Sequence, residues 1–455
     1  MPPKKRVSRR LALNAGEEYT LVGSGAVQIA LQSGVLDVAG VMLDIARPHT
    51  FYLHADRQCI TLFTLEGATC MLSSDSRVDA HRGVARAGKL VQLTRRTILA
   101  ARRTKVLVIG RSRSGKTLAA HTLCNLLMRY GSDKKSVFLI DLNAESNCLY
   151  APGCVTCIQA SEAPLWPGLT ASPKLLPLSL YTGAAVRPSA RNVSSLLHYY
   201  DQLHETAMGY IQDLCGAVAQ PAPSPYASSP SEAQSHVVVD APAPLADLQE
   251  GVWYKKLIEV LRPTHVVIVG SREDGEERWS TFLQEDVQRV LPDCEFLFTD
   301  PVAHPCERTS SRELLREYFT GTPFYSLGCS KVVVPLKSLT FVEELSDGGS
   351  GPGSSSSNSS GDGVTMRVVH PDASFQSLVC ALSYAELLEE VPLAPIAGLM
   401  TIVYVDGENE EVALLLPAAE EPLLRRLVIV PQSRYRDTLR MTSAQVTAME
   451  ECVAV

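Results

Sequence analysis

The residues most able to do chemistry lie in a short glycine-bounded segment, residues 110–117, with the sequence GRSRSGKT. The apolar run VLVI precedes it and a run with helical periodicity follows it, so the segment joins a buried strand to a helix. The pattern GxxxxGK[ST] predicts a phosphate-binding loop, because glycines let backbone N–H groups turn toward phosphate oxygens and the helix N-terminus adds positive potential. We expect Lys116 to reach the β- and γ-phosphates of ATP and Thr117 to ligate Mg²⁺. The other loop residues expected to contact the nucleotide are Arg113, Ser114, Gly115 and Leu118.

An acidic residue at the end of a neighbouring strand should complete such a site. Asp141 closes the apolar run SVFLID, and we expect it to hold Mg²⁺ through water or to accept a proton from an attacking hydroxyl. A purely local role for Asp141, as a helix N-cap or turn residue, is the alternative. Asp240, which closes HVVVD, is a second candidate, although the APAP that follows is also consistent with a simple strand end.

Three arginines, Arg308, Arg312 and Arg316, are spaced by four residues within residues 306–319. On a helix they would share one face, and guanidinium groups over a phosphate site could stabilise transferring charge. An ordinary solvated helix face is the alternative. If the protein catalyses phosphoryl transfer, Lys116, Asp141, Arg308 and Arg312 are the expected catalytic residues.

The elements that must position these residues indicate an α/β fold. VLVIG, SVFLID, HVVVD and HVVIVG are short continuous apolar runs, typical of strands buried on both faces of a parallel sheet, and helical patterns alternate with them. Runs before and after this region are strand-like, which predicts smaller β-rich domains on both sides. The expected organisation is a basic disordered tail (1–10), a β-rich N-terminal domain (11–92), a P-loop ATP-binding domain (93–330) with a surface loop (221–236), and a β-rich C-terminal domain (331–455) with a disordered insert (346–363).

Composition restricts the class of protein. The chain has 455 residues and a formal net charge of −7, so the molecule as a whole is not a nonspecific polyanion binder. No apolar run approaches the roughly 20 residues needed to cross a bilayer, and the 12 cysteines show no disulfide-like spacing, so we expect an intracellular protein without membrane association. The first ten residues, MPPKKRVSRR, carry no acid, and Lys4–Arg10 are consistent with either a nuclear-import signal or a solvated tail.

The chain resembles the polyribonucleotide 5′-hydroxyl-kinase family, and within it the ATP-binding subunits of the pre-mRNA cleavage and polyadenylation machinery. The resemblance rests on EEYTLV, VQIALQSG and FTLEG near the start, the P-loop, YAPG, REYFTG, and PIAGLMTIVYVD near the end. It implies a central P-loop kinase-like domain between two smaller β-rich domains, and a glutamate of the N-terminal domain, Glu18 by position, on the nucleotide base. It also implies a nuclear location and other cleavage factors as partners.

Family kinases transfer the γ-phosphate of ATP to an RNA 5′-hydroxyl, whereas other members keep ATP as a structural ligand. Here the acceptor side departs from the family: the glutamine after Asp141 is missing, the stretch DAPAPLADL that begins at Asp240 contains no aromatic residue, and only Pro188 and Asn192 remain of the segment that grips substrate. We therefore expect an ATP-binding component of the mRNA 3′-end cleavage complex, with ATP structural. An active RNA 5′-hydroxyl kinase, with RNA as a partner, and an unrelated P-loop NTPase that hydrolyses nucleotide as a switch are the alternatives.

Overall fold

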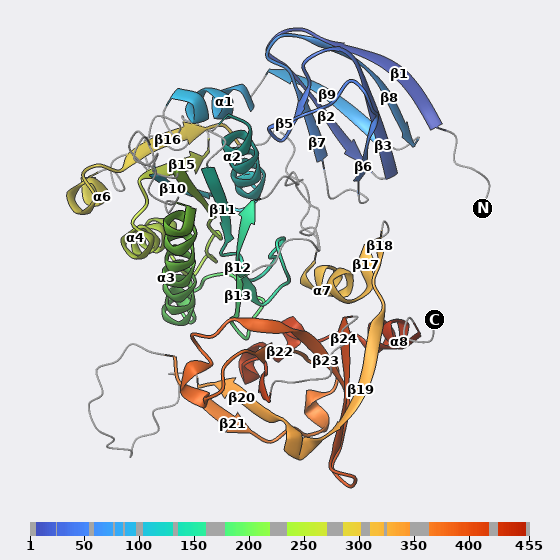
Figure 1. The fold of residues 1–455 in the computed structure, drawn as a ribbon, viewed down its shortest axis with the longest axis vertical. Helices are drawn as coiled ribbons and strands as arrows, with labels where there is room; N and C mark the ends of the chain where they lie inside the picture. Colours follow the sequence, from blue (N-terminus) through green and yellow to red (C-terminus); the bar gives the residue numbers. More distant parts are fainter. Residues whose placement is uncertain are drawn as a thin grey trace, which may run out of the picture.

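The computed structural model describes residues 6–23, 25–53, 59–75, 78–84, 87–96, 103–130, 135–160, 178–218, 234–270, 285–301, 310–322, 325–345, 364–417 and 426–451. Along the chain these form a β-rich N-terminal part, a central α/β part and a β-rich C-terminal part (Figure 1). The expected mixed α/β class with β-rich flanks is confirmed. The expected insert 346–363, most of the loop 221–236, and Arg308 fall outside the described residues.

The central sheet has seven strands in the order β13-β12-β11-β14-β10-β15-β16. Five neighbouring strands are parallel: β11 (Lys135–Asp141), β14 (Gln234–Asp240), β10 (Arg103–Gly110), β15 (His265–Val269) and β16 (Glu295–Thr299). β12 (Cys154–Ala160) and β13 (Leu178–Tyr181) continue the sheet antiparallel. The continuous apolar runs thus became strands buried on both faces, as the sequence predicted.

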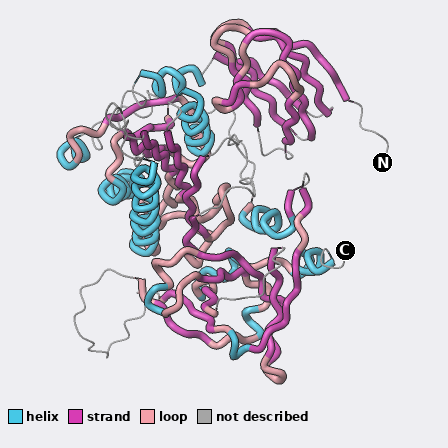
Figure 2. The backbone as a smooth tube through the Cα atoms, viewed as in Figure 1, coloured by secondary structure: helices cyan, strands magenta, loops and turns pink. Residues whose placement is uncertain are grey.

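Helices cover both faces of this sheet (Figures 1 and 2). Alternate residues of β10 point to opposite faces: Leu107 and Ile109 pack in the same core as α3 (Val193–Val218) and α4 (Glu250–Leu261). Val106 and Val108 pack in the core that contains α1 (Ala87–Arg96) and α2 (Lys116–Tyr130). Among the described residues of the central part, the remaining helices are α6 (Glu285–Val290) and α7 (Ser311–Thr320).

The N-terminal part packs two antiparallel sheets, with strand orders β1-β8-β3-β6 and β5-β4-β7-β2-β9, around one apolar core. Its strands are β1 (Arg6–Leu13), β2 (Glu17–Gly23), β3 (Gly25–Gly34), β4 (Asp37–Val38), β5 (Val41–Met42), β6 (His49–Leu53), β7 (Cys59–Phe63), β8 (Ala68–Asp75) and β9 (Val78–Val84).

Strand β1 corrects one expectation. Residues 6–10 were expected to belong to a disordered tail, but they begin β1, which pairs antiparallel with β8 from Arg6 opposite Asp75 to Leu13 opposite Ala68. Pairing with β8 satisfies the backbone groups on one side of the strand while Arg9 and Arg10 stay exposed, and the buried Leu11 and Leu13 anchor the strand. The charged residues of this segment therefore belong to an exposed edge strand, and not to a disordered tail.

The C-terminal part is a seven-stranded sheet in the order β19-β24-β23-β22-β25-β20-β21. Its strands are β19 (Cys329–Pro335), β20 (Thr340–Glu344), β21 (Met366–Val369), β22 (Val379–Ser383), β23 (Ile396–Asp406), β24 (Glu411–Pro417) and β25 (Leu427–Ile429). A small ribbon, β17 (Gly321–Thr322) and β18 (Tyr325–Ser326), precedes it. The helices here are α8 (Ser443–Glu451) and the 3₁₀ turns η3 (Leu336–Ser338), η4 (Ala373–Phe375), η5 (Leu388–Glu390) and η6 (Ser433–Leu439).

Both flanking parts are bonded to the central part. On the N-terminal side, Arg129 of α2 forms an ion pair with the buried Asp37 at 2.7 Å, and Asn125 donates to the carbonyl of Ala39. On the C-terminal side, the Tyr181 hydroxyl donates to the Val379 carbonyl at 2.7 Å. The helix that begins in the phosphate-loop segment therefore also carries the contacts with the N-terminal part.

Candidate nucleotide-binding site

The segment of residues 110–117 forms a tight turn between β10 and α2. Arg113 takes φ +64° and Gly115 takes φ +95°, so left-handed residues recur along the turn. Such conformations direct backbone N–H groups toward one concave side, which suits an anion. Gly110 has φ +147°, and a Cβ there would lie 2.4 Å from the Val269 carbonyl oxygen, so only glycine fits between β10 and β15.

Two polar side chains of the turn fit a phosphate ligand. The ammonium of Lys116 is buried and donates to the Arg111 carbonyl at 2.8 Å, across the loop. The hydroxyl oxygen of Ser114 is buried and makes no hydrogen bond with any described residue. A buried hydroxyl without a protein partner is costly, and phosphate oxygens would satisfy it. The residues present therefore fit a nucleotide phosphate chain.

Thr117 lies beside an acidic residue at the end of a neighbouring strand. Its hydroxyl donates to Oδ2 of Asp240 at 2.6 Å, and Asp240 is buried at the carboxyl end of β14. A threonine hydroxyl and a carboxylate are ligands that suit Mg²⁺ with its usual waters. This pair can therefore hold a magnesium ion or its water shell.

Asp141 lies one strand further from the phosphate loop. It is opposite Asp240 in the parallel register of β11 and β14. Its Oδ1 accepts the backbone N–H of Asn143 at 2.9 Å, and its Oδ2 accepts that of Cys148 at 3.0 Å. These contacts shape the loop that follows β11, as in the turn role left open by the sequence. The expected roles of Asp141 in magnesium binding or proton transfer stay predictions.

The sequence ranked Asp240 second because chain order does not reveal sheet order. β11 follows β10 in the chain, yet β14 is the strand inserted between them. No local feature of HVVVD distinguishes it from SVFLID, whose apolar run is one residue longer, so the sequence alone carries no signal for this strand order.

Glu18 is buried on β2 and lies directly opposite Phe63 of β7. Directly opposed residues of an antiparallel pair point to the same face of the sheet. Phe63 packs in the core that contains α1 and α2 of the central part. Glu18 therefore faces the central part of the molecule, as its expected contact with the nucleotide base requires.

The arginine segment is described from residue 310 onward. Arg312 and Arg316 lie on α7, one turn apart and both exposed, while Leu315 and Phe319 of the same helix pack against the C-terminal part. The Arg312 carbonyl accepts from the Gln445 side chain of α8 at 3.3 Å. The expected lid position of Arg308 and Arg312 over the phosphate loop stays a prediction.

The two segments expected to receive an acceptor substrate bind each other. The guanidinium of Arg187 donates to the carbonyls of Ala243 at 3.2 Å and Pro244 at 2.5 Å. In return the Leu245 N–H donates to the Pro188 carbonyl at 2.7 Å. These three hydrogen bonds join residues 187–188 directly to residues 243–245.

A second cluster of possible metal ligands lies on α3. One ligand atom from each of Asp201, His204 and Glu205 falls within 4.8 Å of the others. However, Nε2 of His204 contacts the ammonium of Lys105, and burial lowers the pKa of Lys105 only to about 8, so the ammonium is charged at neutral pH. A charged ammonium at this position disfavours a cation, and we assign no metal there.

A parallel sheet with a phosphate loop after β10, and a threonine–aspartate pair beside it, define a P-loop nucleotide-binding protein. Residues 110–321 match the family model of the mRNA cleavage and polyadenylation factor CLP1 P-loop. This match of the central region confirms the resemblance drawn from the sequence.

Solved structures are similar over nearly the whole chain. A wild-type Clp1p–Pcf11p complex matches with a TM-score of 0.68 at 16% identity, covering 95% of this chain and 99% of that one. A second structure, of the extended interface between Pcf11p and Clp1p and the basis of ATP loss in a glycine-to-arginine mutant, matches with a TM-score of 0.68 at 17% identity, covering 94% and 99%. At these identities the likeness establishes the fold.

No curated protein matches this sequence. Within the part of the chain that the structure describes, no helix has the length and apolar character required to span a membrane.

Proposed function

We propose that this protein is a nuclear ATP-binding component of the mRNA 3′-end processing machinery, required for endonucleolytic cleavage before polyadenylation, and that its ATP is structural. The match of residues 110–321 to the CLP1 P-loop family model supports a role in mRNA cleavage and polyadenylation. The structural likeness to Clp1p bound to Pcf11p supports partnership with other cleavage and polyadenylation factors.

The observation that carries the structural role of ATP is the asymmetry between the two sides of the site. On the phosphate side, the left-handed turn, Lys116 and the Thr117–Asp240 pair provide what binding requires. On the acceptor side, Arg187 is bonded to the carbonyls of residues 243 and 244. Phosphoryl transfer needs an acceptor hydroxyl held in line at close range, whereas binding does not.

In this proposal each residue has a defined task. Lys116 and the loop N–H groups neutralise the phosphates, Thr117 and Asp240 hold Mg²⁺ or its waters, and Glu18 contacts the base. Bound ATP supplies only phosphate charge and a base between the N-terminal and central parts. Because ATP binds the folded form alone, it stabilises that form by mass action.

An active RNA 5′-hydroxyl kinase is the second candidate. Two buried carboxylates, Asp141 and Asp240, end adjacent parallel strands, and Arg312 and Arg316 are exposed on α7. In that case Asp141 would take the acceptor proton, and Arg308 and Arg312 would stabilise the transferring phosphoryl group.

The deciding experiment incubates the purified protein with Mg²⁺ and γ-labelled ATP, with and without a 5′-hydroxyl RNA oligonucleotide. Lys116→Ala is the matched variant. ATP retained by the wild type without label on the RNA supports the structural role. Label on the RNA that Lys116→Ala abolishes establishes the kinase instead, and multiple-turnover hydrolysis without RNA would indicate a nucleotide switch.

A second experiment tests whether the protein assembles with the mRNA cleavage and polyadenylation machinery. The tagged protein is mixed with purified cleavage and polyadenylation subunits, including a Pcf11-type protein, and complexes are separated by size. Co-elution that is stronger for ATP-loaded wild type than for Lys116→Ala supports the proposal. A chain that elutes alone from every mixture would contradict it.

A further inference from the structure

One turn of α4 holds two loops of the nucleotide site. Trp253 donates its indole N–H to the Pro242 carbonyl at 3.0 Å, two residues beyond Asp240. The next residue, Tyr254, donates its hydroxyl to the Gly110 carbonyl at 2.7 Å, at the first residue of the phosphate loop. Both aromatic side chains have no exposed surface. Adjacent residues of one helix therefore fix both the loop after Asp240 and the start of the phosphate loop.

We infer that Tyr254 is a positioning residue for nucleotide binding: through the Gly110 carbonyl it sets the direction in which the phosphate loop leaves β10. This inference rests on the proposed ATP binding and assigns it a determinant outside the GxxxxGKT segment. Tyr254 acts through Gly110 and touches no ligand atom itself.

The physical argument starts from the geometry of Gly110. Its φ of +147° is open to glycine and strained for other residues, so intrinsic preference does little to hold the peptide in one orientation. A hydrogen bond to its carbonyl from a rigid, fully buried side chain restricts that freedom. The N–H groups that follow then point to the concave side before ligand arrives, which lowers the entropy lost on binding.

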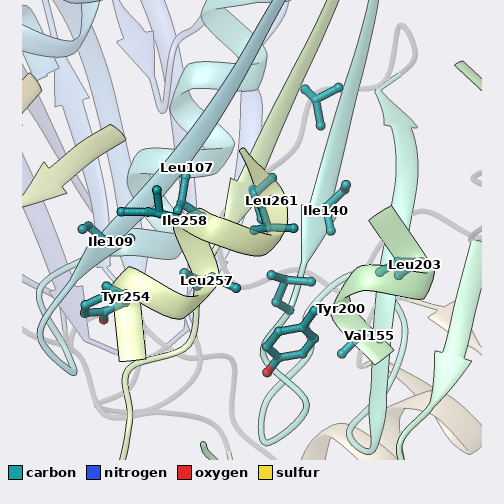
Figure 3. Packing of buried hydrophobic residues seen from close by; sticks show 14 of the residues in the cluster. Leu107, Ile109, Ile140, Val155, Tyr200, Leu203, Tyr254, Leu257, Ile258 and Leu261 are labelled. Atoms are coloured by element: carbon teal, nitrogen blue, oxygen red, sulfur yellow. The ribbon is translucent and has the colours of Figure 1, made fainter. Parts of the chain in front are cut away.

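The side chain that makes this bond is itself firmly placed. Tyr254 packs in one core with Leu107 and Ile109 of β10, and with Leu257 and Ile258 of its own helix (Figure 3). Burial raises the pKa of its hydroxyl well above the ordinary value, so the group remains a neutral donor at physiological pH. Rotation of the loop would leave this donor unsatisfied in an apolar core.

The chain supplies a matched control in Tyr200. This residue is also fully buried in the same core and packs edge-on against Trp253, with ring centroids 5.9 Å apart. Its hydroxyl has no hydrogen-bond partner among the described residues. Tyr254→Phe and Tyr200→Phe therefore remove the same atom from the same core, but only the first removes a bond to the phosphate loop.

The test measures ATP dissociation constants and melting temperatures, with and without Mg²⁺-ATP, for the full-length wild type and both variants. We expect Tyr254→Phe to weaken ATP binding about tenfold, while Tyr200→Phe binds as the wild type does. The ATP-induced rise in melting temperature should shrink only in Tyr254→Phe. Since that rise is measured from each variant's own nucleotide-free midpoint, a general loss of stability does not reproduce it.

Three results would overturn the inference. Wild-type affinity in Tyr254→Phe, or equal weakening in both variants, would show that the bond to Gly110 does not position the loop, and would leave the proposed function intact. Absence of ATP binding by the wild type itself would overturn the proposed function together with this inference.

Discussion

The Thr117 hydroxyl lies 2.6 Å from Oδ2 of Asp240, which joins the first turn of α2 to the carboxyl end of β14. The two residues are 123 positions apart in the chain. β14 is the strand next to β10, so the carboxylate lies beside the start of the helix that the phosphate loop begins. Under the proposed function, this contact makes Asp240 better placed than Asp141 to share with Thr117 the binding of a magnesium ion.

Asp240→Asn should therefore weaken ATP binding in Mg²⁺ by about 10- to 100-fold, with little change in EDTA, because the variant keeps the shape and loses the charge.

Asp141→Asn should affect the stability of the protein and not the magnesium dependence of ATP binding. Its carboxylate accepts two backbone N–H groups, so an amide in its place costs about 1–3 kcal/mol of stability without removing the magnesium dependence. Binding isotherms with and without Mg²⁺ distinguish them, and loss of magnesium dependence in Asp141→Asn alone would reverse the assignment.

Gly110→Ala should disrupt the turn at the start of the phosphate loop, between β10 and α2. The added Cβ would lie 2.4 Å from the Val269 carbonyl oxygen, so β10 and β15 would have to separate. We expect a loss of about 1–3 kcal/mol in the free energy of unfolding and no measurable ATP binding.

Gly209→Ala is the matched control for that substitution. Gly209 is exposed on α3 and an added Cβ there meets nothing within 4 Å. Alanine favours helix by about 1 kcal/mol over glycine, so this variant should be more stable, with unchanged ATP affinity. Denaturant unfolding measures both, and a stable, ATP-binding Gly110→Ala protein would contradict the geometry of the turn.

Gly40→Ala tests the junction between the N-terminal part and α2. Gly40 has φ +82°, and an added Cβ would lie 2.9 Å from the Thr122 carbonyl oxygen of α2. Gly16 has nearly the same φ, +79°, with nothing within 4 Å. Both alanine variants carry the same backbone strain, roughly 1 kcal/mol, but only Gly40→Ala pushes the two parts of the molecule apart.

We expect Gly40→Ala to increase protease cleavage between the N-terminal and central parts and to weaken ATP binding. Gly16→Ala should lower the melting temperature slightly and leave both other properties unchanged. Limited proteolysis with and without ATP measures the effect. Identical behaviour of the two variants would show that contact with α2 does not couple the N-terminal part to the nucleotide.

Stability should fall as pH drops from about 6.5 to about 4. Burial lowers the pKa of His121 from 6.5 to about 4, and burial followed by the nearby Lys105 ammonium does the same for His204. Between these values the unfolded chain binds protons that the folded chain does not, so stability rises with pH and is lost on acidification. Each histidine contributes up to about 3 kcal/mol. The raised pKa values of Asp37 and Glu344 oppose this, because their folded forms retain protons.

The variant that isolates this effect is His121→Leu. Nδ1 of His121 has no hydrogen-bond partner among the described residues, so an apolar side chain is tolerated there. The slope of unfolding free energy against pH, from 6.5 to 4, should decrease by up to one proton. The exposed His370, changed to Gln, is the control, and equal slopes for all three proteins would show that His121 titrates normally.

Much of this architecture could be predicted from local pattern. Residues 106–109 and 237–240 are apolar without interruption, and strands of that kind must be buried on both faces. The strand–turn–helix around Lys116 follows from the glycine spacing and from the run with helical periodicity after it. The high positive charge of residues 6–10 predicted a disordered tail, but backbone pairing with β8 orders that segment while Arg9 and Arg10 stay exposed to solvent.

The phosphate loop, the α/β core between β-rich parts and the set of acidic candidates can all be predicted from the sequence, because each depends on residues close together in the chain. Which of the two acids contacts Thr117 follows from the sheet order, since β14 lies between β10 and β11. The hydrogen bonds from Arg187 to the carbonyls of residues 243 and 244, and from Tyr254 to Gly110, 144 positions away, are likewise visible only in the folded structure. Such contacts depend on strand order and helix packing, which arise from the burial of the whole core, and no local pattern encodes them.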